Sequence, residues 1–347
     1  MQQATKGQFA LYSQTVQMIC HKFLTNIDNT QQARNQNKRL RYPYKDKRFY
    51  PLYWPAQAVS VEPGRVVLPM GRGRQSLVLH LDLPADTGAC TIAWNDGYEL
   101  HVAITQTRDE EPPGAERAAI DLGEIHQAAV TTSTGVALVV SGRGIRSIKR
   151  RRNQALGTIA RKRARCKKGS KRWRKLQRAR RKVSARTERQ VRDLRHKGIR
   201  QVVNFCVEQH VGTVYIGNPD GVRRRPAGRH HSQRMAQWEY GRDIDYLIHK
   251  CAQRHIESFT GTERGTSSRC PVCGRMQRKP KGREWVCREL SCGFCGHRDV
   301  VGSANMHRIA YGQPIPFPHQ ITYRRPGPVR VRARNEQPRP VVRTGKS

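Results

Sequence analysis

The sequence lacks the marks of a membrane or exported protein. No apolar run approaches the ~18 residues that a membrane-spanning helix needs. The N-terminus has no apolar core of the kind found in signal peptides. These absences exclude a spanning segment and predict a soluble, cytoplasmic protein.

Acidic residues are also scarce. The 347 residues include 26 Asp and Glu against 66 Lys and Arg, a formal net charge of +40. That imbalance is too large for an ordinary globular surface, and it predicts a polyanionic partner because phosphates relieve the self-repulsion. A membrane surface is the rival polyanion, but nothing in the sequence favours it. We therefore expect a nucleic-acid-binding protein.

The positive charge is concentrated between Ser141 and Arg200. This stretch holds 26 Lys and Arg against two acidic residues, Glu188 and Asp193. Apolar and small residues recur in it at helical spacing from Trp173 to Leu194, so one helix face can pack on protein while the other meets phosphates. The residues expected to bind nucleic acid are Arg150, Arg151, Arg161, Lys162, Arg163, Lys171, Arg172, Arg174, Lys175, Arg178, Arg192 and Lys197.

Half of the ten cysteines lie within one short segment, from Cys270 to Cys295. Such clustering is typical of metal binding in a reducing compartment rather than of a disulfide framework. The spacing Cys270-Pro-Val-Cys273 lets two thiolates meet one tetrahedral zinc ion. We expect Cys270, Cys273, Cys287 and Cys292 to form a structural zinc site. The spacing of Cys292 and Cys295 leaves Cys295 as an alternative fourth ligand.

The pattern of apolar residues predicts a multi-domain α/β protein. An N-terminal helix is followed by alternating apolar residues and an Asn95-Asp96-Gly97 turn, which indicate a small antiparallel β-barrel or sandwich, and we expect the barrel. A Glu- and Pro-rich linker then leads to three strands typical of a ribonuclease-H-like core. The expected domains are a helical region (1–48), a β-barrel (49–114), a ribonuclease-H-like core (115–265) with a basic helical insertion (141–210), a zinc ribbon (266–298), a last core helix (299–312) and a disordered basic tail (313–347).

Two aspartates occupy positions suited to metal chemistry. Asp121 lies on a short apolar strand, and Asp299 opens a helix directly after the cysteine segment. Each position also has a purely structural explanation, because a strand residue can be capped by a donor and an acid at a helix start is favoured by the dipole. Together with the basic region, the pair indicates a nuclease whose carboxylates hold divalent cations.

The order of these motifs resembles the transposon-encoded TnpB family, the ancestors of type V CRISPR effectors. The motifs are Ile120-Asp-Leu-Gly123, the basic helical hairpin ending near His196, the Thr266-Ser-Ser segment with its Cys-Pro-Val-Cys knuckle, and Cys292-Gly-Phe-Cys-Gly-His-Arg-Asp299. The resemblance covers about 33–311 and includes the Arg41-Tyr-Pro-Tyr segment. It is the combination of motifs that is specific.

The resemblance implies an RNA-guided DNA endonuclease encoded by a transposable element. It also implies a location in a prokaryotic cytoplasm, in association with the nucleoid. A wedge-like barrel and helical region would hold guide RNA and duplex DNA, and a RuvC-type core would cut DNA with Mg²⁺. By the same resemblance, Asp121 is the first catalytic carboxylate and Asp299 is the last.

The chain departs from the family at the carboxylate between these two. The family usually has a glutamate at the end of the strand after the basic helices, where this sequence has Gly217. Glu263 follows the next strand, and two parallel neighbouring strands would bring their carboxyl ends to the same edge of the sheet. We expect Glu263 to replace the missing glutamate. Asp220, in a loop, and Glu257, at the opposite strand end, are weaker candidates.

Two other functions stay open at this point. Without a third carboxylate, the protein would be a nuclease-inactive, RNA-guided DNA-binding protein such as a repressor. A structural RNA-binding protein with a zinc ribbon is the third possibility. The family also usually begins with a barrel strand and a longer recognition region, whereas this chain begins inside a helix, as a miniature or truncated form would.

Overall fold

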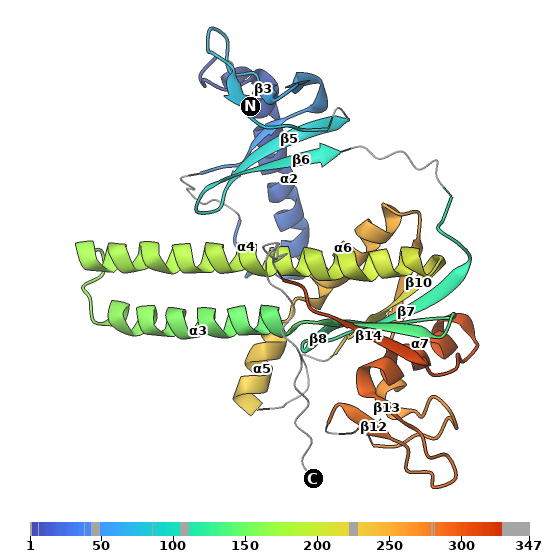
Figure 1. The fold of residues 1–347 in the computed structure, drawn as a ribbon. Coiled ribbons are helices and arrows are strands. Elements are labelled where there is room, and N and C mark those ends of the chain that lie inside the picture. Colours follow the sequence, from blue (N-terminus) through green and yellow to red (C-terminus); the bar gives the residue numbers. More distant parts are fainter. Residues whose placement is uncertain are drawn as a thin grey trace, which may run out of the picture. The chain divides into compact units, whose positions relative to one another are not determined.

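The computed structural model divides the chain into two compact units, Met1–Arg108 and Asp109–Ser347. It describes residues 2–5, 7–37, 39–42, 49–84, 86–104, 111–221, 228–278, 280 and 282–327. Figure 1 shows the elements of each unit. None of the helices in these described ranges combines the length and apolar character that crossing a bilayer requires.

The first unit has two helices and two separate three-stranded antiparallel sheets, β1-β5-β6 and β2-β3-β4. The expected hairpin is present, with Asp96 and Gly97 at positive φ between β5 and β6. Both sheets contribute to one core around the fully buried Trp54. The elements are α1 (Gln2–Thr5), α2 (Ser13–Gln36), β1 (Leu52–Trp54), η1 (Ala56–Ala58), β2 (Ser60–Glu62), β3 (Arg65–Leu68), β4 (Leu77–Leu79), β5 (Thr87–Trp94) and β6 (Tyr98–Ile104).

This arrangement corrects the expected β-barrel over 49–114. Among the described residues of this unit, the strands do not close into one barrel. Strands β2, β3 and β4 have only three or four residues each. Leu81 and Leu83 continue the alternating pattern and pack on the core, but they lie beyond the end of β4 and have no strand partner there. Alternation of apolar residues therefore indicated contact with the core at Leu81 and Leu83 without guaranteeing strand pairing.

The second unit is built on a six-stranded mixed sheet in the order β11-β10-β7-β8-β9-β14. Strands β7, β8 and β9 form an antiparallel meander, while β10 pairs parallel to β7 and β11 parallel to β10. This confirms the side-by-side parallel strands expected of a ribonuclease-H-like core. The strands are β7 (Glu116–Leu122), β8 (His126–Thr132), β9 (Val136–Ser141), β10 (Val211–Asn218), β11 (Glu257–Thr262) and β14 (Gln320–Arg324).

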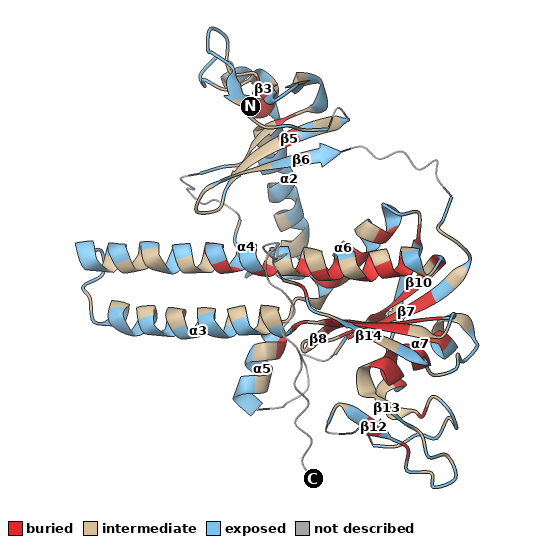
Figure 2. Ribbon diagram, in the orientation of Figure 1, coloured by how far each residue is buried: buried red, intermediate tan, exposed pale blue. Residues whose placement is uncertain are grey.

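Helices cover both faces of this sheet. Helices α4 (Lys171–Glu208) and α6 (Tyr240–Ala252) bury one face, with Ile199, Val203 and Leu247 in the same core as alternate residues of β7. Helix α7 (Arg298–Tyr311) lies on the other face, against β7 and β8. In Figure 2, the buried residues of this unit gather in the sheet and in the parts of α4 and α7 that cover it.

The basic region forms a helical hairpin, α3 (Arg143–Ala164) followed by α4. Gly169 takes the positive φ that the tight connection needs, and the Ser170 side chain caps α4 by accepting a hydrogen bond from the Trp173 backbone N–H. The small and apolar positions from Trp173 to Leu194 are half-buried or buried, which confirms the expected packing stripe.

Two further expectations need correction. The sequence between Ser232 and Arg254 predicts one helix with Ser232 as its N-cap. The structure instead has two helices, α5 (Gly228–Gln237) and α6, and Ser232 lies inside α5. The tail expected to be disordered from Gln313 contains β14, which pairs parallel to β9 at the sheet edge. Residues 328–347 of that tail lie outside the described residues.

A buried polar cluster ties α4 to α6. Arg195 and Asp243 are each 2% exposed, and the Arg195 Nε lies 3.4 Å from Asp243 Oδ1. Gln127 donates a hydrogen bond of 3.0 Å to the same oxygen. Burial is the main influence on Asp243, and it raises the pKa of this carboxyl to about 6 in spite of the nearby Arg195 charge.

This pKa predicts a pH-dependent stability. Because the pKa of Asp243 is higher in the folded state than its ordinary 3.8, its contribution is complete below about pH 4 and is lost as the pH rises through about 6. In urea unfolding, the free-energy difference between the wild type and Asp243→Asn should change by up to about 3 kcal/mol between about pH 4 and 7. A difference that stays constant over this range would contradict the prediction.

Candidate active site and zinc ribbon

Three carboxylates singled out in the sequence, Asp121, Glu263 and Asp299, line a single cavity of about 490 Å³, here called the carboxylate cavity. Asp121 lies on β7, Glu263 directly follows β11, and Asp299 is in the first turn of α7. Because β7, β10 and β11 are parallel, their carboxyl ends open at the same edge of the sheet.

Asp121 faces α7 because of the alternation along β7. Ala118, Ile120 and Leu122 enter the core under α4 and α6, so Asp121 points to the opposite face. There it meets the backbone of Gly302. A Cβ atom on this glycine would lie only 2.5 Å from Asp121 Oδ2. The absence of a side chain at Gly302 therefore lets α7 approach the carboxylate closely.

Glu263 reaches the position left open by Gly217. In the register of the sheet, Gly217 of β10 pairs with Gly261 of β11, two residues before Glu263. A Cβ atom added to Gly217 would lie 3.3 Å from Glu263 Oε2 and 2.6 Å from Met306 Cε. The glutamate carboxylate therefore occupies the space beside the strand end where the family usually has its own glutamate.

Asp299 is held by cations and a histidine. Arg283 Nη1 donates to both carboxylate oxygens, at 3.0 Å and 2.7 Å, and His126 Nδ1 lies 2.7 Å from Oδ2. Arg298 Nε is 3.4 Å from Oδ1. Burial alone would raise the pKa of Asp299, but the His126 hydrogen bond and the arginine charges outweigh it and hold the pKa at about 2.

The ligand atoms of His126, His297 and Asp299 all lie within 4.8 Å of one another. Asp121 and Glu263 do not join this group, so the carboxylates share the cavity without gathering as tightly. Burial lowers the pKa of His297 below its ordinary value and favours its neutral form.

Several residues of this site were not identified from the sequence: His126, Arg283 and Gly302, with His297 noted only as part of a motif. His126 opens β8, and no spacing rule connects it with a residue as distant as Asp299. Gly302 stands one turn after Asp299 in a helix, where glycine costs about 1 kcal/mol relative to alanine. A glycine at that position was the one available signal of a close approach.

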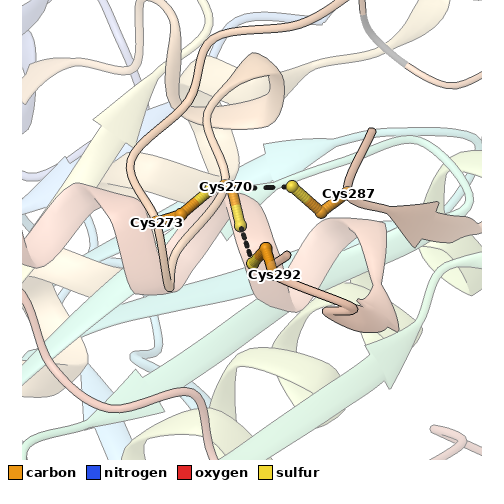
Figure 3. Close-up of side chains that lie close together, drawn as sticks. All are labelled: Cys270, Cys273, Cys287 and Cys292. Atoms are coloured by element: carbon orange, nitrogen blue, oxygen red, sulfur yellow. Dashed lines mark hydrogen bonds between the residues drawn. The ribbon is translucent and has the colours of Figure 1, made fainter. Parts of the chain in front are cut away.

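The cysteine segment brings Cys270, Cys273, Cys287 and Cys292 together, with all four sulfurs within 4.8 Å of one another (Figure 3). The Sγ atoms of Cys270 and Cys292 are 3.8 Å apart, and those of Cys273 and Cys287 are 3.6 Å apart. A tetrahedral ion with Zn–S bonds of about 2.3 Å requires sulfurs about 3.8 Å apart. These four thiols therefore fit zinc.

The thiols differ in how readily they ionise. Burial raises the pKa of Cys270 to about 12, whereas a backbone N–H of Arg275 is the main cause that lowers the pKa of Cys273 to about 7. A thiolate at Cys270 therefore needs a bound cation. Cys295 lies outside the group, on β13 (Cys295–His297), with its Sγ 3.2 Å from Glu284 Oε1 on β12 (Glu284–Val286).

This grouping predicts which cysteine is the fourth ligand. The purified wild-type chain should contain about one zinc ion, and Cys292→Ser should lose most of it because a thiolate ligand is removed. Cys295→Ser is the matched control and should retain its zinc. Elemental analysis by mass spectrometry measures both. Loss of zinc from Cys295→Ser with retention in Cys292→Ser would reverse the assignment.

The basic residues expected to bind nucleic acid lie on α3 and α4, and most of them are exposed. The exposed ones are Arg150, Arg151, Arg161, Lys162, Lys171, Arg172, Arg174, Lys175 and Arg178. The other three are partly buried. Arg163 stacks over the Trp173 ring, and Lys197 pairs with Asp193 at 2.8 Å, so both also have structural roles.

Comparison with known proteins identifies two parts of the chain. A family model named OrfB_IS605, described as "Probable transposase", matches residues 100–223. A second model, "Cas12f1-like, TNB domain", matches residues 240–306, which include the cysteine group and Asp299. No curated protein matches the chain significantly.

A solved structure shows a similar fold. A Cas12f1–sgRNA–target DNA complex aligns over 79% of this chain and 67% of that chain, with a TM-score of 0.57 and 15% identity. A CRISPR-Cas12f ternary complex aligns over 79% and 66% with a TM-score of 0.46, and CasPhi-2 (Cas12j) bound to crRNA over the same shares with 0.40, each at 13% identity. The first model bears out the resemblance of this chain to the transposon-encoded TnpB family, and the second adds a Cas12f1-like domain over the segment that holds the cysteine group and Asp299.

Proposed function

We propose that this protein is an RNA-guided DNA endonuclease of a transposable element, which cuts DNA by two-metal phosphodiester hydrolysis in a RuvC-like site. The observation that carries the proposal is the convergence of Asp121, Glu263 and Asp299 on the carboxylate cavity. Glu263 is the decisive member, because its carboxylate lies beside Gly217, where the usual glutamate is missing.

The donor set suits Mg²⁺, which prefers carboxylate oxygens and water. Asp121, Glu263 and Asp299 would hold the ions. Bound there, Mg²⁺ ions would activate water and stabilise the leaving oxygen. With a pKa of about 2, Asp299 is ionised throughout the neutral range and available as an anionic ligand.

The arginines that line the carboxylate cavity would bind the DNA backbone. Arg234, Arg283 and Arg298 line it together with the carboxylates. Their guanidinium groups can bind the phosphates on either side of the scissile bond and orient the DNA backbone. The Arg283 side chain is 33% exposed, so it can turn from Asp299 toward a phosphate.

The positive charge of the α3–α4 hairpin and the similarity to Cas12f1 both support nucleic-acid partners. The α3–α4 hairpin exposes a row of arginines and lysines that suits a phosphate backbone. The similar Cas12f1 structure is a complex with sgRNA and target DNA. We propose a guide RNA and a duplex DNA target as the partners, with the first unit acting as the wedge-like part of the complex.

The direct test is to purify the protein with its co-expressed RNA, sequence that RNA, and supply duplex DNA that matches it. Cleavage with Mg²⁺ and its loss with EDTA support the proposal. Guided binding without cleavage would identify the nuclease-inactive, repressor-like alternative instead. RNA binding with neither guided DNA binding nor cleavage would leave the structural RNA-binding alternative.

Substituting Glu263 tests the relocated carboxylate. Glu263→Gln should slow cleavage by at least about 100-fold, since losing a metal ligand should exceed the 10–100-fold effects of outer-shell substitutions. DNA binding by the RNA complex should be unchanged. Glu257→Gln, at the opposite end of β11, is the matched control and should cut at the wild-type rate. Wild-type cleavage by Glu263→Gln would refute the assignment.

Substituting Gly302 tests the close approach of α7. A methyl group there must displace Asp121, so Gly302→Ala should lower the cleavage rate by about tenfold or more while zinc content is retained. Gly157→Ala is the control, because a Cβ on this α3 residue meets nothing within 4 Å. Equal cleavage rates for Gly302→Ala and wild type, measured with the same guide and target, would show that the approach is unimportant.

A further inference from the structure

Two histidines lie beside Asp299 at one end of the carboxylate cavity, and one of them, His126, lines the cavity itself. His126 lies at the start of β8 and lines the cavity, while His297 ends β13 and directly precedes α7. Their ring centroids are 5.1 Å apart, and both histidines offer nitrogens within 4.8 Å of an Asp299 oxygen. Three separate elements thus deliver two imidazoles and one carboxylate to one point.

The geometry of this group is close to that of a metal ligand set. His126 Nδ1 and Asp299 Oδ2 are 2.7 Å apart, whereas neighbouring ligands of an ion with bonds of about 2.1 Å lie about 3 Å apart. Small movements would therefore admit an ion. His297 Nδ1 is buried and has no hydrogen-bond partner among the described residues, so one nitrogen of this ring lacks a structural use.

The chemistry of the donors favours some ions over others. Mg²⁺ binds oxygen ligands and gives up its water reluctantly. Imidazole nitrogen instead suits first-row transition ions such as Fe²⁺, Ni²⁺, Cu²⁺ and Zn²⁺, and two histidines with one carboxylate are a set that such ions accept with open positions for water. Mn²⁺ binds most weakly in this series, so nitrogen bonding to Mn²⁺ is the most demanding test of the site. The composition of the group therefore selects against Mg²⁺ at this position.

The positive charge of two neighbouring arginines also bears on which ion can bind. Arg283 and Arg298 lie beside Asp299 and offset its negative charge. Their positive charge opposes every divalent ion at this position equally, so an ion bound here needs the additional bonding that imidazole nitrogen gives to a transition ion. The Arg283 side chain is one-third exposed, and its guanidinium can leave the carboxylate when an ion arrives.

We propose that His126, His297 and Asp299 bind a first-row divalent transition ion, so that one of the two metal positions of the proposed nuclease takes such an ion in preference to Mg²⁺. The role in cleavage rests on the proposed function, but the binding site does not. Asp121 and Glu263, on the oxygen-rich side of the cavity, are left to hold the second ion.

Mn²⁺ is the probe of choice, since it is paramagnetic and competes poorly for the four-cysteine site. The zinc-loaded, RNA-bound protein is titrated with Mn²⁺ and followed by electron paramagnetic resonance. Pulsed measurements then report whether ¹⁴N nuclei are bonded to the bound ion. We expect nitrogen coupling, and Mg²⁺ should displace this Mn²⁺ only at a concentration at least about tenfold higher.

Two variants and a control complete the experiment. His297→Asp replaces a nitrogen with an oxygen donor and should reduce both the nitrogen coupling and the Mn²⁺ preference, the latter by about tenfold. His126→Gln should weaken Mn²⁺ binding by a similar factor. His249→Ala, on the exposed side of α6, should change neither, and zinc content checks that each variant is folded.

The results separate this inference from the proposed function. Bound Mn²⁺ without nitrogen coupling, or an unchanged Mn²⁺ preference in His297→Asp, overturns the histidine site even if the protein cuts DNA with Mg²⁺. Nitrogen coupling that is lost in His297→Asp supports the site even if no guided cleavage is found.

Discussion

The burial of helix α7 between the six-stranded sheet and the cysteine ribbon is the constraint on which the candidate site depends. Val300 packs with strand residues of the sheet, while Val301, one position on, packs with Trp285 and two of the grouped cysteines. A helix buried on opposite sides has little freedom to shift or rotate. Its first turn can therefore present Asp299 to the sheet edge at a fixed position.

The ribbon contributes more than a scaffold for zinc. Asn305 of α7 donates hydrogen bonds to the carbonyl oxygens of Thr266 and Arg269, at 2.8 Å and 2.7 Å, which attach the helix to the start of the ribbon. From within the same segment, Arg283 reaches back to Asp299. The position and the charge of this carboxylate thus both depend in part on contacts with the ribbon.

Some of this could be predicted from the sequence. Local patterns were sufficient for the meander around Asp121, the cysteine group and the basic helical hairpin, because periodicity and spacing act over a few residues. The position of Glu263 was predicted from the parallel pairing of β10 and β11, and the shared cavity agrees with it.

The rest depends on contacts that no local pattern encodes. His126 joins Asp299 through a hydrogen bond spanning 173 positions, and β14 forms only because the edge of β9 is available. The barrel expectation failed because apolar alternation reports contact with a core, and residues such as Leu81 are half-buried against the core without a strand partner. The break between α5 and α6 likewise lies within a region whose apolar pattern suits one continuous helix.

The most direct test of the central claim is an experimental structure of the RNA-loaded complex with divalent cations and target DNA. The account predicts cation density between Asp121, Glu263 and Asp299, with carboxylate oxygens at about 2.0–2.2 Å from ions about 4 Å apart. A Glu263 side chain turned away from the cavity, with no other carboxylate beside Gly217, would contradict it.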